Sequence, residues 1–455
     1  MITSQFRDKK VGIWGLGTVG ISALNFFYQQ QAYIQVMDHQ VPDEKSIKLL
    51  EKYQATYISQ EQVSLFWESN DYILASPGID IRAYGHIYKD KIITELDIFE
   101  HYYKHPYIAV TGSIGKTSVV TLLDTLFNHH NIQSQTAGNI GRGMLDLLNL
   151  QRSEQTILEL SSFQLEYTKY IAPKLSVITN IFENHLDRHD TFVSYKIAKF
   201  KILQSPSTQK LIPLELWQDV PYPIQQDPRT HFFSLNARPN TLPINKTQKL
   251  YTYYQDHLVC IQDGVICPII PVKDLPQVSF ALNWLIVIAS YVILLQKIPQ
   301  LNQNHSYTLP NNRCQLVGEY KGISFYNDSK STIMESTLMA IDSLQPQKII
   351  VLIGGLSKGA NRAPFFRAFQ SKILRVICFG READTLASYA QQANLNFDVC
   401  YDLRTAFSTA CSYATAGTAI LLSPGGSSYD LFKNYTERGQ QFCELVTDYI
   451  ISQTK

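Results

Sequence analysis

Short apolar segments alternate with segments that can form helices along most of the chain. The pattern begins with a strand at residues 10–13, a glycine-rich turn and a helical repeat of apolar residues that ends near Phe27. Further strands are expected at residues 33–37 and 72–75. This order is typical of a doubly wound parallel sheet.

The same alternation starts again twice, after the polar stretches 101–105 and 301–310, which we interpret as linkers. The second set of strands is expected at 106–110, 156–160 and 175–179, and the third at 323–326, 348–353, 376–379 and 419–422. The pattern therefore predicts an α/β protein of three domains. These are a Rossmann-like domain at 1–104, a central domain with a parallel sheet at 105–310, and a Rossmann-like C-terminal domain at 311–455.

The amino-acid composition argues against several classes of protein. The 455 residues are 45% hydrophobic and 17% charged, as in folded globular proteins, and they are too many for one ordinary core. A net charge of +1 argues against a broad nucleic-acid-binding surface. The most apolar stretch, 283–295, falls short of the roughly 20 residues that span a bilayer, so we expect a buried helix there. Seven dispersed cysteines fit a reducing compartment, and we expect a cytoplasmic protein without membrane insertion.

The first candidate site is Gly15-x-Gly17-x-x-Gly20, which follows a strand and opens a helix. Backbone amides there suit a diphosphate. Asp38 lies 18 residues after Gly20, about where an acid binds a ribose in dinucleotide enzymes. The motif does not distinguish NAD from a UDP-sugar, because both ligands carry a diphosphate. The alternative is a tight turn with only a structural role.

The second candidate site is the loop from Thr111 to Thr117, TGSIGKT. Its glycines let amides approach phosphates, Lys116 would neutralise phosphate charge, and the Thr117 hydroxyl would bind Mg²⁺. The strict phosphate-loop pattern has a glycine where this chain has Val110. A structural strand-to-helix turn is again the alternative.

Polar side chains follow the next two strands. Glu159, at the carboxyl end of a strand, is placed to bind Mg²⁺ or to cap the following turn. His185 suits a metal or a substrate carboxylate, whereas we expect His189 to be a solvated loop residue. The spacing of the lysines in residues 195–201 indicates, by itself, a basic face of a helix.

These motifs occur together in one order. TGSIGKT, AGNIGR, LELSSFQLE and NHLDRH are followed by NRC at 312–314, YNDSKST at 326–332, GGLSK at 354–358 and LSPGGSSYDLFKNYTERG at 422–439. The chain resembles the Mur ligases of peptidoglycan synthesis over its whole length. LELSSFQLE and the last string resemble the members that add D-glutamate.

The resemblance implies an ATP-dependent amide ligase of cell-wall synthesis, which serves cell shape and division. The carboxylate of UDP-N-acetylmuramoyl-L-alanine would attack the γ-phosphate of ATP, and the D-glutamate amine would then attack the acyl phosphate. It also implies two Mg²⁺ ions and a carbamylated lysine. ATP would sit between the central and C-terminal domains, with a hinge near residues 309–312, in a monomer.

The resemblance also assigns residues. The central residues comprise ATP contacts at Gly112, Ser113, Gly115, Lys116, Thr117 and Asn283, metal ligands at Thr117, Glu159, His185 and the carbamylated Lys199, and a substrate contact at Asn139. The C-terminal residues comprise ATP contacts at Arg313 and Asp328 and D-glutamate contacts at Thr332, Lys358, Ser428 and Tyr429. The UDP-substrate residues are Gly15, Gly17, Thr18, Asp38, Ser76 and Gly78, and the residues expected to be catalytic are Lys116, Asn139, His185, Lys199 and Lys358.

Three positions depart from the family pattern. Ile114 stands where an asparagine is usual, residues 277–283 lack a His-Asn pair before Asn283, and His39 replaces a small hydroxyl residue. Two alternatives therefore remain at this stage. One is a non-catalytic nucleotide-binding relative, and the other is an NAD-dependent oxidoreductase built on the first glycine motif.

Overall fold

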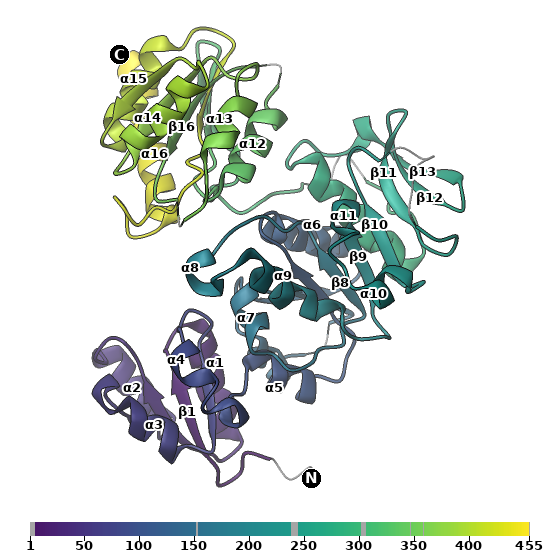
Figure 1. Cartoon of the computed structure of the whole chain (residues 1–455), viewed down its shortest axis with the longest axis vertical. Helices are drawn as coiled ribbons and strands as arrows, with labels where there is room; N and C mark the ends of the chain where they lie inside the picture. Colours follow the sequence, from purple (N-terminus) through teal and green to yellow (C-terminus); the bar gives the residue numbers. More distant parts are fainter. Residues whose placement is uncertain are drawn as a thin grey trace. The chain divides into compact units, whose positions relative to one another are not determined.

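The computed structural model describes residues 5–151, 153–237, 244–301, 306–345, 347–357 and 359–454. The chain folds into two compact units. The first comprises residues 1–181, 193–276 and 281–307, and the second comprises 182–192, 277–280 and 308–455. Figure 1 shows the elements in sequence colours.

The N-terminal sheet has four parallel strands in the order β3-β2-β1-β4. Its strands are β1 (Lys10–Trp14), β2 (Tyr33–Met37), β3 (Thr56–Tyr57) and β4 (Tyr72–Ala75), and its helices are α1 (Thr18–Gln29), α2 (Glu44–Lys52), α3 (Val63–Ser69) and α4 (Arg82–Gly85). Trp14, Phe66 and Trp67 pack in its core. Helix α5 (Glu95–Tyr102) then leads into the central sheet, and a capping box between Thr94 and Asp97 fixes its start.

The central sheet has nine strands in the order β13-β12-β11-β10-β9-β8-β5-β7-β6. They are β5 (Ile108–Thr111), β6 (Ser134–Gly138), β7 (Gln155–Glu159), β8 (Leu175–Ile178), β9 (Gln209–Pro213), β10 (Thr230–Phe233), β11 (Leu250–Tyr254), β12 (His257–Gln262) and β13 (Val265–Pro271). Strands β5 to β11 pair in parallel, and β12 and β13 extend the sheet as antiparallel strands. The helices are α6 (Lys116–His129), α7 (Ser162–Glu166), α9 (Phe192–Phe200), α10 (Tyr222–Gln226) and α11 (Ala281–Leu295).

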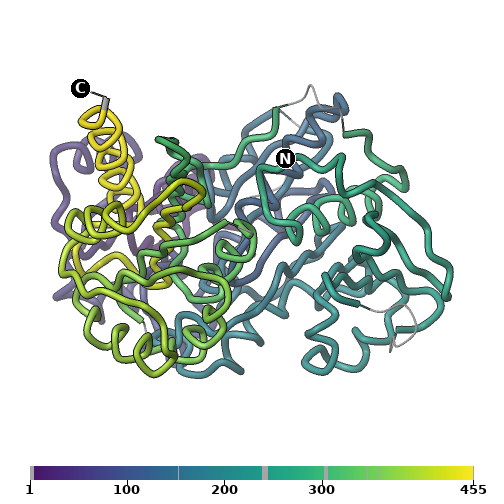
Figure 2. The backbone as a smooth tube through the Cα atoms, turned by 90° about the horizontal axis from the view of Figure 1, so that it is seen from above, coloured from purple at the N-terminus to yellow at the C-terminus, as the bar shows by residue number. Residues whose placement is uncertain are grey.

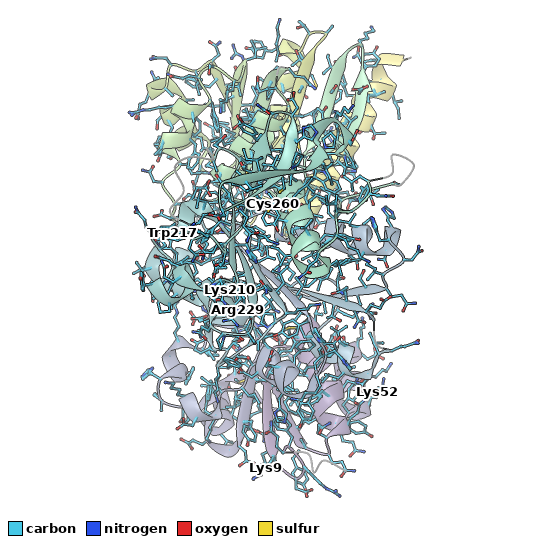
Figure 3. The ribbon with its side chains drawn as sticks, turned by 90° about the vertical axis from the view of Figure 1, so that its right-hand side faces the viewer. Lys9, Lys52, Lys210, Trp217, Arg229 and Cys260 are labelled. Carbon is cyan, nitrogen blue, oxygen red and sulfur yellow. The ribbon has the colours of Figure 1, made fainter. Side chains whose placement is uncertain are left out.

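Helix α11 confirms the buried apolar helix expected from the sequence, since most of its side chains are buried. Near β9 and β10 the buried ammonium of Lys210 pairs with Asp227 at 2.9 Å, and Arg229 joins the same carboxylate. Figure 3 labels Lys210 and Arg229 side by side. This ion pair joins β9 to the residues that lead into β10.

The C-terminal sheet has six strands in the order β14-β15-β19-β16-β17-β18. They are β14 (Gln315–Tyr320), β15 (Ile323–Asn327), β16 (Lys348–Gly354), β17 (Arg375–Phe379), β18 (Phe397–Cys400) and β19 (Thr418–Leu422). Its helices are α12 (Met334–Ser343), α13 (Ala363–Ala368), α14 (Ala383–Gln392), α15 (Leu403–Tyr413) and α16 (Tyr435–Thr454), and α16 is the yellow helix that ends the chain in Figure 2. Apolar side chains from both faces of the sheet form two cores.

The expected α/β class with three sheets is confirmed. Strand β14 was not expected, and it pairs antiparallel to β15 through a turn at Lys321-Gly322, where both residues have positive φ. Its residues are only half-buried, which explains the weak apolar pattern.

Candidate functional site

The phosphate-loop candidate joins β5 to α6. Gly112 has a φ of 152° and Gly115 a φ of 82°, both in the region that favours glycine. A Cβ on Gly115 would lie 2.8 Å from Oδ1 of Asn283, so the glycine also permits a close approach to α11. Lys116 folds back over the loop and donates to the carbonyl oxygens of Gly112 at 2.7 Å and Ser113 at 3.1 Å. Thr117, half-buried, is the second residue of α6.

Asn180 holds this loop in place, a structural role that none of the sequence motifs indicates. Its side-chain oxygen accepts from the amide of Ile114 at 3.0 Å, and its nitrogen donates to the Ile114 carbonyl at 3.1 Å. Thr179 donates to the same carbonyl at 2.6 Å. The backbone of Ile114 is thus fixed by two residues that follow β8. Their position at the carboxyl end of a strand is the signal that could have identified them.

Asn139 and Glu159 contact one another at the ends of neighbouring strands β6 and β7. The Asn139 side chain donates to Oε1 of Glu159 at 2.7 Å, and its amide donates to the Glu159 carbonyl at 2.8 Å. Glu159 is buried, and its Oε2 accepts no hydrogen bond from any residue that the structure describes. A buried carboxylate oxygen that accepts no hydrogen bond is a suitable ligand for a cation.

Lys199, on α9, is buried rather than part of an exposed basic face, which corrects the interpretation from spacing alone. Its ammonium donates to the Gly112 carbonyl at 2.8 Å and lies 4.7 Å from the centre of the Tyr195 ring. Burial, and then the charge of Lys116, lower the pKa of Lys199 well below its usual range, while Glu159 opposes the shift. The Tyr195 hydroxyl in turn lies 3.0 Å from that of Ser113.

His185 precedes the short helix α8 (Leu186–His189) and has a φ of 55°. It belongs to residues 182–192, which cluster with the second unit. His189, expected to be a solvated loop residue, is instead the last residue of α8 and is buried. Among the described residues, no three His, Cys, Asp or Glu side chains gather as a preformed metal cluster.

The first glycine motif forms the expected tight turn. Gly15 has a φ of 96°, and a Cβ on Gly20 would collide with its carbonyl oxygen. Ser76 donates to that carbonyl at 2.9 Å, and the Asp38 carboxylate accepts from the amide of Leu16 at 2.6 Å. Asp38 therefore holds the turn itself.

The start of α1 is open to a ligand. Gly17 and Thr18 are exposed, and no side chain described in the structure caps the helix at Gly17. Gly78 is exposed after β4 and has open space around its Cα. His39, which stands where the family usually has a small hydroxyl residue, has its Nδ1 2.5 Å from the side-chain nitrogen of Gln60. Free amides at a helix N-terminus attract phosphate groups.

In the second unit, Asp328 is buried just after β15. It accepts from the Cys314 amide at 3.0 Å and from the Ser423 hydroxyl at 2.7 Å. Burial raises its pKa to about 7, and the hydrogen bonds from Ser423 and Cys314, followed by the charges of Arg313 and Arg438, oppose that shift. Arg313 donates to the carbonyl of Asn311 at 3.2 Å.

Of the four residues expected to bind D-glutamate, three lie in described loops of the same unit. Thr332 is half-buried after β15, Ser428 is buried, and Tyr429 is 70% exposed. Lys358 lies outside the described residues. Lys330 is exposed, with its ammonium 4.0 Å from the centre of the Tyr435 ring.

No helix in the described part of the chain is both long and apolar enough to cross a membrane.

Known proteins match the chain along most of its length. Residues 9–86 match the Mur ligase MurD-like N-terminal domain, residues 110–253 the Mur ligase middle domain, and residues 312–426 the Mur ligase glutamate ligase domain. The UDP-N-acetylmuramoylalanine–D-glutamate ligase of Latilactobacillus sakei is 30% identical, over 97% of this chain and 98% of its own. The enzyme of the same name from Coxiella burnetii is 30% identical, over 95% of this chain and 98% of its own.

Solved structures share the fold. MurF ligase from Thermotoga maritima, in complex with ADP, aligns with a TM-score of 0.58 and 13% identity, over 99% of this chain and 97% of its own. The UDP-N-acetylmuramate-alanine ligase of the same organism aligns with a TM-score of 0.57 and 14% identity, over 97% of this chain and 100% of its own. From the matched domains and the full-length identity to its relatives, the chain belongs to the Mur ligase family.

Proposed function

We propose that the protein is an ATP-dependent ligase that joins D-glutamate to UDP-N-acetylmuramoyl-L-alanine in peptidoglycan synthesis. Full-length similarity to ligases of that name supports the choice of substrates. The observation that carries the chemistry is the buried Oε2 of Glu159, which accepts no hydrogen bond from a described residue, in the domain that holds the phosphate loop. A turn without chemistry would not need a buried carboxylate that interacts electrostatically with the buried Lys199, which disfavours the non-catalytic relative.

The phosphate loop would bind ATP through the amides of Gly112, Ser113 and Gly115, with Lys116 contacting the phosphates. Lys116 now donates to two loop carbonyls, so it would exchange these weak acceptors for phosphate oxygens, which form stronger, charge-assisted hydrogen bonds. Asn283, close to Gly115, would line the nucleotide site. Arg313 and Asp328 are the proposed ATP contacts of the C-terminal domain.

The donor set fits Mg²⁺, which usually binds one or two carboxylates together with substrate phosphates and water. Thr117 and Glu159 would hold one ion, and His185 with a carbamylated Lys199 would hold the other. Bound Mg²⁺ neutralises phosphate charge, which lets two anions approach. The lowered pKa of Lys199 supports carbamylation, because only a neutral amine adds carbon dioxide.

The remaining groups would position the two other substrates. The amides at the start of α1, with Gly15, Gly17, Thr18, Asp38, Ser76 and Gly78, would bind the uridine nucleotide, which accounts for the glycine motif without NAD. Asn139 would contact the muramoyl end of that substrate. Thr332, Lys358, Ser428 and Tyr429 would bind D-glutamate, where the Lys358 ammonium would pair with a carboxylate.

The proposal includes three domains, at 1–104 for the UDP-substrate, 105–310 for ATP and 311–455 for the amino acid. The proposal also places the protein in the cytoplasm, where ATP and nucleotide-linked precursors are made. It further includes a monomeric state, which analytical ultracentrifugation tests.

Omission assays test the function. Phosphate release should require ATP, Mg²⁺, UDP-N-acetylmuramoyl-L-alanine and D-glutamate together. Release that continues without the nucleotide substrate, or its absence in the complete mixture, would contradict the proposal. Nicotinamide cofactor binding in a thermal-shift assay would instead favour the oxidoreductase.

A further inference from the structure

Two loops meet at the carboxyl edge of the C-terminal sheet. One follows β16 and runs through Gly355 to Ser357, and the other follows β19 and contains Ser428. The amides of Leu356 and Ser427 each donate to the carbonyl of the other at 2.9 Å. The two loops therefore form one backbone unit, which includes Ser357, the residue before Lys358 in the sequence, and Ser428.

Arg362 supports the first loop. Its side chain is 2% exposed, and its guanidinium donates to the carbonyl oxygens of Gly354 at 3.3 Å and Gly355 at 3.2 Å. It also forms an ion pair with Glu382, whose other carboxylate oxygen accepts from the Ser357 amide at 3.0 Å. The pair thus contacts the loop at both ends.

The second loop packs against the same guanidinium. A Cβ on Gly426 would lie 2.9 Å from Nη1 of Arg362, and a Cβ on Gly355, where φ is 73°, would collide with the carbonyl of Ser427. Only glycine at these two positions lets the backbones approach this closely. The Arg362 guanidinium therefore contacts both the loop after β16 and the loop after β19, and it helps to set the distance between them.

A buried ion pair is weak support for stability, because desolvation offsets most of its attraction. Arg362 is also too buried to touch a substrate. We infer that Arg362 and Glu382 are positioning residues, which hold residues 355–357 and the loop of Ser428 at the spacing that binding of D-glutamate requires. The inference rests on the proposed function, which places D-glutamate at these loops.

Steady-state kinetics of Glu382→Gln and Arg362→Lys test this role. Loss of a charge-assisted contact should raise the KM for D-glutamate by about tenfold, with the KM for ATP and for the nucleotide substrate unchanged. Lysine cannot replace the planar fork that reaches two carbonyls and a carboxylate. The matched control is Asp398→Asn, which breaks the 2.6 Å Arg375–Asp398 pair near the amino ends of β17 and β18 and should leave all three KM values unchanged.

The double variant Arg362→Met with Glu382→Met separates positioning from stability. Removing both charges leaves no unpaired buried charge, so the double variant should melt above either single methionine variant, while its KM for D-glutamate stays raised. A KM for D-glutamate within about twofold of wild type in the folded variants would overturn the inference. So would an equal rise in all three KM values. A wild-type enzyme without D-glutamate-dependent phosphate release would instead overturn the proposed function.

Discussion

Lys116 and Lys199 donate to the same acceptor, the carbonyl oxygen of Gly112, at 2.7 Å and 2.8 Å. Burial disfavours charge on Lys199, and repulsion between two ammonium groups so close adds to that cost. The arrangement favours a neutral amine at Lys199, which is the form that can be carbamylated.

Lys199→Ala should therefore lose activity and recover part of it when short-chain carboxylates are added, since these would replace the carbamate oxygens. The matched control is Lys196→Ala on the same helix, where the side chain pairs with Asp219. Phosphate release measures both. Full activity of Lys199→Ala without added carboxylate would count against the carbamate.

Glu159→Gln should raise the Mg²⁺ concentration needed for half-maximal activity and lower kcat by roughly 100-fold, because an amide oxygen replaces the charged ligand. Its hydrogen bond from Asn139 can persist on the remaining oxygen. Titration of Mg²⁺ at saturating ATP measures the change, with the exposed Glu51→Gln as control. An unaltered Mg²⁺ requirement would show that Glu159 only caps a turn.

Asn180→Ala should free the backbone of Ile114 and so weaken the phosphate loop. We expect a loss of about 1–3 kcal/mol in the free energy of unfolding and a higher KM for ATP, since the Ile114 amide loses its partner. Urea unfolding and ATP kinetics measure both, and the exposed Asn128→Ala on α6 serves as control. Equal effects of the two substitutions would contradict this role for Asn180.

Glu95 gives the protein a pH-dependent stability. Its Oε1 accepts from the amides of Met144 at 2.6 Å and Leu145 at 3.4 Å, and burial, with a smaller contribution from Asp146, raises its pKa from about 4.5 to about 8. The folded form keeps this proton after the unfolded chain has released it. The stabilisation is thus complete below about pH 4.5 and is lost as pH rises toward about 8, by about 1.4 kcal/mol per unit for the one proton.

Glu95→Gln, which stays neutral, should remove this slope. Asp328, whose pKa is raised to about 7, contributes a similar slope to both proteins, so the difference between them isolates Glu95. Urea unfolding across this pH range is the measurement. Parallel pH profiles for the two proteins would rule out a protonated Glu95.

The sequence predicted those parts of the site that depend on local chain geometry. The glycine turns at Gly15 and Gly115 have the positive φ that their motifs require, and Glu159 ends a strand as expected. Each of these features needs only a strand, a turn and a helix in order, so neighbouring residues encode it.

Features that depend on contacts distant in the chain were not predicted. From spacing alone Lys199 looks like one of several lysines on a helix; the family resemblance assigned it a role, and only packing shows that it is buried against Gly112. Asn180 and Ile114 are separated by 66 residues, and Arg362 and Glu382 by 20. No pattern within either segment indicates these partners, because the pairing is set by the order of strands in the sheets.

An amino-acid panel in the phosphate-release assay tests the central claim most directly. With ATP, Mg²⁺ and UDP-N-acetylmuramoyl-L-alanine present, D-glutamate should support release and L-glutamate, L-alanine and D-alanyl-D-alanine should not. Release with another amino acid and none with D-glutamate would contradict the account.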